Sequence, residues 1–160
     1  MTAVFYSARD VVEAAIEKER RRRNFYETVT QLSTNPDMKG LFHYLTEEEN
    51  KHVAACTRIR DCLPEGAGRE EDMKDLNTYI DSITDDRLYS KMDSREFVQQ
   101  AIDSWNVFSL AIGFEKDSIL FFMEFLPHLS ESDRTIVGDL IKEEKEHIVR
   151  LLEVMKQIDG

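Results

Sequence analysis

Apolar residues recur every three or four positions along most of this chain, which is the spacing of an amphipathic helix. Proline, glycine and capping residues interrupt that spacing and divide the chain into separate helices. We expect four long helices, at about 8–33, 36–62, 94–126 and 131–158, and one short helix at about 69–84.

Residues suited to helix starts support three of these boundaries. Asn35 is a favourable N-cap, and Pro36 is favourable as the first residue of the helix that follows. Asp93 and Glu96 resemble a capping box, and Ser130 is suited to cap the last helix. These helices therefore begin where side chains can satisfy free backbone N–H groups.

A turn-rich segment separates the two pairs of long helices. Residues 63–68 read Leu-Pro-Glu-Gly-Ala-Gly and precede the expected short helix, so residues from about 63 to 92 form one long crossover. We expect residues 1–160 to form a single all-α domain. In it, the crossover joins two helical hairpins into a four-helix bundle.

The two halves of the chain carry the same pattern of candidate metal ligands, a lone glutamate followed by Glu-x-x-His. In the second copy the lone glutamate lies 96 residues after its counterpart, and the Glu and the His of Glu-x-x-His each lie 95 residues after theirs. A Glu and a His three residues apart share one face of a helix and can reach one point. The six residues are Glu19, Glu49 and His52 in the first half and Glu115, Glu144 and His147 in the second.

Four carboxylates and two imidazoles are the ligand set of di-iron and di-manganese sites in ferritin-like four-helix bundles. Because an isolated acid is costly to bury among apolar residues, we expect the set to hold two metals inside the bundle. We expect Glu49 and Glu144 to bridge the metals and Glu19 and Glu115 to be terminal ligands. The imidazole of each half would bind one metal.

The ligand of the first helix has two competitors, Glu13 and Glu17. Glu19 is favoured because the aromatic Tyr26 follows it by seven positions, as an aromatic residue follows the lone glutamate of the second half. Tyr26 is then either a hydrogen-bond donor to a ligating carboxylate or an ordinary core residue.

Other residues near the pattern have ordinary interpretations. The runs Glu47–Glu49 and Glu143–Glu146 are also compatible with solvated helix faces, and we expect Arg20–Arg23 to be one. We expect Trp105 and the phenylalanines that follow it at helical spacing to lie in the core or in dimer contacts.

Charge and apolar runs exclude several classes of partner. The net charge of −11 argues against nucleic acids and anionic membranes. No apolar run approaches the roughly 18 residues of a membrane span, and the first residues lack a signal-peptide pattern. Cys56 and Cys62 do not form a Cys-x-x-Cys pair, and we expect both to be reduced packing residues of a cytoplasmic protein.

Four segments around the repeat carry a further signal: Glu19 with Phe25-Tyr26, Glu47–His52, Glu115–Phe122 and Glu143–Ile148. Together they resemble the rubrerythrin family of ferritin-like proteins. The resemblance covers about 8–156 and is least clear at 63–92. It implies a non-haem di-iron centre that reacts with peroxide or dioxygen, with the six residues of the repeat as its ligands.

Four features depart from the rubrerythrin pattern. Rubrerythrins also carry a rubredoxin module with two Cys-x-x-Cys pairs, which this sequence lacks, so we expect a separate electron donor, a rubredoxin-like protein or a flavoprotein. Ser118 stands where rubrerythrins have an additional glutamate, which puts redox-linked movement of iron in doubt. Phe122 stands where a tyrosine is common, and Arg22 where the residue is usually small.

Three functions remain open from the sequence. Two ferrous ions could reduce hydrogen peroxide or dioxygen, each iron giving one electron. A ferritin-type storage subunit would use the same site to oxidise Fe(II), and a non-enzymatic helical module would hold a structural metal. We expect two iron ions, with manganese as the alternative, no haem, and a homo-oligomer, with a dimer favoured.

Overall fold

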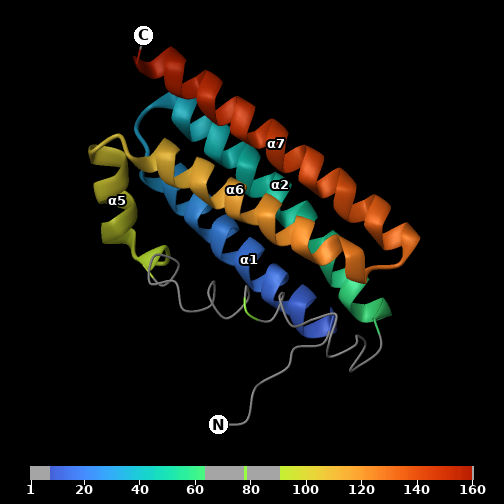
Figure 1. Cartoon of the computed structure of the whole chain (residues 1–160). Coiled ribbons are helices and arrows are strands. Elements are labelled where there is room, and N and C mark those ends of the chain that lie inside the picture. Colours follow the sequence, from blue (N-terminus) through green and yellow to red (C-terminus); the bar gives the residue numbers. More distant parts are fainter. Residues whose placement is uncertain (1–7, 64–77, 79–90, 160) are drawn as a thin grey trace.

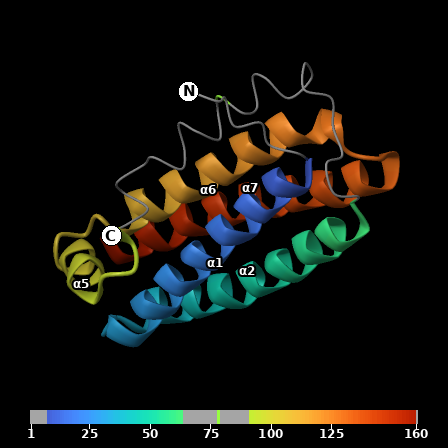
Figure 2. The same cartoon turned by 90° about the horizontal axis from the view of Figure 1, so that it is seen from below.

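The computed structural model describes residues 8–63, 78 and 91–159. Four long helices run side by side in a bundle (Figures 1 and 2): α1 (Ala8–Leu32), α2 (Pro36–Cys62), α6 (Val107–Phe125) and α7 (Glu131–Asp159). The helix α1 packs chiefly against α2, and α6 chiefly against α7, so the two predicted hairpins are present. The predicted short helix at 69–84 falls almost entirely outside the described residues.

Capping side chains lie at the starts of two helices, with one correction to the sequence prediction. The Asn35 side chain accepts hydrogen bonds from the backbone N–H groups of Asp37 and Met38, at 3.0 and 3.1 Å. Ser94, and not Asp93, is the N-cap of α5 (Arg95–Asp103), where its hydroxyl accepts from the Phe97 N–H. The predicted capping box is therefore wrong by one residue, because the serine beside Asp93 takes the capping position.

The single helix predicted at 94–126 is wrong, because the chain breaks it into α5 and α6 at Ser104–Asn106. Trp105 has a φ of 59°, in the left-handed region. The Asn106 N–H donates to the Ala101 carbonyl at 2.9 Å and the Trp105 N–H to the Ile102 carbonyl at 3.1 Å, which together form a Schellman motif. Glycine usually marks this motif, so its absence concealed the break.

The core has two apolar clusters separated by a polar layer. One cluster contains Ile16 from α1 and Phe121 from α6, and the other contains Phe25 from α1 and Phe114 from α6. The buried acids and imidazoles described below lie between these clusters along every long helix. The bundle therefore surrounds its polar groups with apolar side chains on both sides.

The two cysteines have different environments. Cys56 is buried in the first apolar cluster, and burial raises the pKa of its thiol. Cys62 is exposed at the end of α2, so the prediction that both cysteines are packing residues is wrong for Cys62. The helix period places it on the outer face of the last turn of α2. None of the helices in the described ranges combines the length and the apolar character of a membrane span.

We expect the free energy of unfolding of Trp105→Gly to exceed that of Trp105→Ala by about 1 kcal/mol, because a left-handed conformation costs a non-glycine residue on that order. The Trp105 side chain is 54% exposed, and both variants lose the contacts of its buried part. Trp105→Ala keeps the strained conformation, whereas Trp105→Gly relieves it. Urea unfolding followed by circular dichroism measures the difference. A Gly variant no more stable than the Ala variant would contradict this account.

Candidate metal centre

The six residues of the repeat lie together in the interior of the bundle. Each is at most 1% exposed. Each long helix contributes, with single glutamates on α1 and α6 and a Glu-x-x-His on each of α2 and α7. On α1, Glu13 and Glu17 are exposed whereas Glu19 is buried, so Glu19 is the glutamate of this helix that joins the cluster.

The cluster divides into two overlapping groups, in each of which ligand atoms lie within 4.8 Å of one another. Glu19 and His52 belong only to the first group, and Glu115 and His147 only to the second. Glu49 and Glu144 belong to both. Two metal ions bridged by two carboxylates would need this arrangement, with two glutamates shared and one Glu and one His specific to each ion.

The two shared carboxylates turn one oxygen toward each imidazole. Glu49 Oε2 lies 3.6 Å from His52 Nδ1, and its Oε1 lies 3.9 Å from His147 Nδ1. Glu144 Oε1 lies 2.7 Å from His52 Nδ1, and its Oε2 lies 3.8 Å from His147 Nδ1. The two imidazole rings are nearly parallel, with centroids 5.6 Å apart. This geometry suits carboxylates that bridge two ions.

The two unshared glutamates are held by different hydrogen-bond donors. The Tyr26 hydroxyl donates to Glu115 Oε1 at 2.7 Å. Of the two roles that the sequence allowed for Tyr26, the structure therefore supports the hydrogen-bond donor. Glu19 Oε1 accepts from Arg22 Nη2 at 3.2 Å and from the Ser118 hydroxyl at 3.0 Å. Each glutamate is thereby oriented by groups outside the ligand set.

The prediction that Arg20–Arg23 is a solvated face is wrong for Arg22, which is buried. Its side chain is 1% exposed and lies beside the cluster, whereas Arg21 is partly exposed and pairs with Glu17 on the surface. Helix periodicity explains the difference, because Arg22 lies on the same face of α1 as Glu19, one turn further along. A run of four basic residues on a helix cannot remain on one face.

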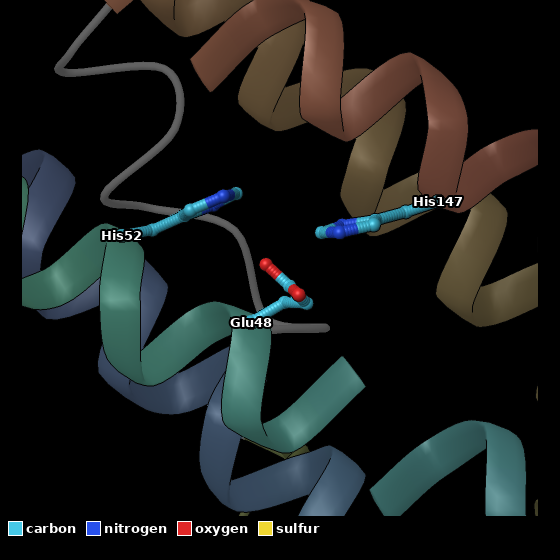
Figure 3. Close-up of side chains that lie close together, drawn as sticks. All are labelled: Glu48, His52 and His147. Atoms are coloured by element: carbon cyan, nitrogen blue, oxygen red, sulfur yellow. The ribbon is translucent and has the colours of Figure 1, made fainter. Parts of the chain in front are cut away.

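Two further carboxylates, which the sequence analysis did not single out, lie beside the imidazoles. Glu143 Oε2 lies 2.8 Å from His52 Nε2, and the Glu143 side chain is 45% exposed. Glu48 lies near both imidazoles, and Figure 3 shows the rings directed toward one another with the Glu48 carboxylate close by. The repeat could have identified this pair, because Glu48 and Glu143 each precede a shared glutamate and are 95 residues apart.

Unsatisfied polar atoms indicate that the cluster suits cations. Buried atoms without a hydrogen-bond partner among the described residues include both oxygens of Glu49, Glu144 Oε2, Glu115 Oε2 and His147 Nδ1. Such atoms are costly to bury unless they are paired or bound to metal. Carboxylate oxygen with imidazole nitrogen suits iron or manganese, so the residues fit a two-metal centre.

Burial and charge crowding shift several pKa values in the metal-free site. Burial, with the neighbouring Glu144 and Glu19, raises the pKa of Glu49 well above its usual value. Burial would lower the pKa of His52, but the neighbouring carboxylates of Glu144, Glu19 and Glu49 together outweigh it and raise this pKa. Burial would raise the pKa of Glu19, but the charge of Arg22, together with Glu49 and His52, outweighs it and lowers this pKa.

The fold resembles that of a solved protein from Thermotoga maritima, described as a candidate ferritin-like diiron-carboxylate protein. The match has a TM-score of 0.66 and 23% sequence identity, and it covers 97% of this chain and 98% of that one. No protein-family model matches this chain, nor does any curated protein sequence. The all-helical bundle therefore has a ferritin-like fold, as the sequence predicted, while the narrower rubrerythrin resemblance stays a prediction.

Metal binding should release protons, because Glu49 and His52 have raised pKa values and must lose their protons to bind a metal. A proton competes with the metal at any pH below these raised values, so the metal affinity should increase with pH up to them. Calorimetric titration with Fe(II) at one pH, in buffers of different ionisation enthalpy, counts the protons. We expect at least one per chain, and heats that do not depend on the buffer would contradict it.

Proposed function

We propose that this protein is a non-haem di-iron oxidoreductase that reduces hydrogen peroxide, or dioxygen, with electrons from a separate donor. The observation that carries the proposal is the arrangement of Glu49 and Glu144, whose paired oxygens face the imidazoles of both halves. The ferritin-like fold and the description of the Thermotoga protein agree with it.

Iron is the proposed metal, and manganese remains the alternative. Four carboxylates are hard ligands that suit Fe(II) and Mn(II), and two imidazoles favour iron, copper or zinc. Iron suits both the carboxylates and the imidazoles, and this supports iron as the metal. When bound, two ferrous ions would supply the two electrons that reduce one peroxide molecule to water.

The surroundings of the cluster favour a very small substrate. A cavity of about 10 Å³ between α1 and α6 is lined by Glu19, Arg22 and Ser118, together with Phe121 and Phe122. This volume holds about one water molecule. Because the cavity is this small, it favours a reactant such as peroxide or dioxygen over an organic substrate.

One partly exposed carboxylate orients the imidazole of the first half. His52 turns Nδ1 toward Glu144 and Nε2 toward Glu143, at 2.7 and 2.8 Å. With a metal at Nδ1, the Nε2–H would donate to Glu143, which fixes the orientation and the tautomer of the ring. Peroxide reduction also needs protons, and Glu143, which is 45% exposed, can exchange them with water beside the buried cluster.

An anaerobic di-ferrous sample should be oxidised by hydrogen peroxide, with about one peroxide consumed per two irons because each iron gives one electron. Stopped-flow mixing with peroxide and, separately, dioxygen measures the rates at the ferric absorbance. Peroxide should react faster, and sustained turnover should require an added reductant.

Two other outcomes would contradict the proposal. Uptake of Fe(II) far beyond two ions per chain, with mineral formation, would identify a ferritin-type storage subunit. Slow oxidation by both reagents in a protein that retains its iron would identify a structural metal site.

A further inference from the structure

We propose that Arg22 is a resident cation of the metal centre that makes the two metal positions unequal, by weakening the position beside His147. This inference rests on the proposed two-metal function and adds to it an order of filling. The ligand pattern does not require an arginine at this position. The second half of the repeat has the uncharged Ser118 there, 96 residues later.

The guanidinium of Arg22 is fixed in the interior of the bundle. Its side chain is 1% exposed. Nη2 donates to Glu19 Oε1 at 3.2 Å, and Nη1 donates to the Phe114 backbone carbonyl at 3.4 Å. These bonds hold the group between α1 and α6, so its charge acts on the cluster from one direction.

On the side of His147, the charge faces one oxygen that a metal would need. Arg22 Nη1 lies 3.6 Å from Glu144 Oε2, which is the oxygen of this shared carboxylate directed at His147. Glu115 turns Oε2 toward Arg22 at 3.8 Å and Oε1 toward His147 at 3.6 Å. A metal at this position would therefore share Glu144 Oε2 with a fixed positive charge.

On the side of His52, the guanidinium contacts an oxygen that faces away from the imidazole. Arg22 makes its shortest carboxylate contact there, 3.2 Å to Glu19 Oε1, while Glu19 Oε2 is the oxygen that lies 3.8 Å from His52 Nδ1. Glu144 presents Oε1 to His52, the oxygen that does not contact Arg22. This position therefore keeps its inward oxygens free of the guanidinium.

Charge counting also predicts that the second ion binds more weakly than the first. Four carboxylates and one guanidinium leave a formal charge of −3 when both imidazoles are neutral. A first divalent ion lowers that charge to −1, and a second ion over-neutralises the site. In the protein interior, unit charges a few ångströms apart interact strongly enough to change an affinity by on the order of tenfold or more.

Anaerobic calorimetric titration with Fe(II) alone tests the proposal. Wild type should bind one ion tightly and a second more weakly. Arg22→Gln keeps hydrogen-bond donors but removes the charge, so the second step should tighten by at least about tenfold. Arg23→Gln is the matched control, because Arg23 forms exposed hydrogen bonds with Asn24 and Asn50, and it should titrate like wild type.

Two further variants locate the weak position and separate charge from packing. Glu115→Gln should remove the weak step and leave the tight one, because Glu115 belongs only to the His147 group. Arg22→Lys keeps the charge and should keep the second step weak. If Arg22→Gln unfolds without metal and refolds with Fe(II), the resident-cation role is supported.

The contradictory results are distinct from a failure of the proposed function. Two ions that bind wild type and Arg22→Gln with the same affinity ratio would overturn the inference alone. So would an Arg22→Gln variant that stays unfolded in saturating Fe(II), because that would indicate a packing role. A wild-type protein that binds no Fe(II) would overturn the two-metal proposal itself.

Discussion

Four carboxylates buried at one level of a helical bundle are the constraint on which the rest of this structure depends. Each is at most 1% exposed, and charged groups in such surroundings are costly unless they are compensated. The compensation comes from one guanidinium, two imidazoles and the proposed metals. Two apolar clusters enclose this layer and keep water away from it, which strengthens every electrostatic interaction inside.

The internal repeat gives the centre an approximate two-fold symmetry that its outer residues break. Tyr26 holds Glu115 by a hydroxyl, whereas its counterpart Phe122 has none. Arg22 and Ser118 together hold Glu19 in its place. A symmetrical ligand set thus lies in asymmetrical surroundings, which is a physical basis for two metals with different affinities and different access to a small reactant.

The sequence predicted the parts of the structure that follow from periodicity. Glu19, Glu115 and Glu144 share helix faces with apolar residues, so their burial follows from spacing. The single helix at 94–126 was wrong because the apolar period continues through Trp105, while the break depends on a left-handed residue that is not glycine. The run Arg20–Arg23 was treated as one solvated face, although a helix turns one of the four inward, and the sequence did not determine that Arg22 faces the site.

Anomalous diffraction from crystals of the iron-loaded protein is the most direct test of the claim that six residues hold two metals. The account predicts two iron peaks per chain, one beside His52 and one beside His147, with Glu49 and Glu144 in contact with both. Iron bound at the alternative group of Glu48, His52 and His147, or one peak per chain at full loading, would contradict it.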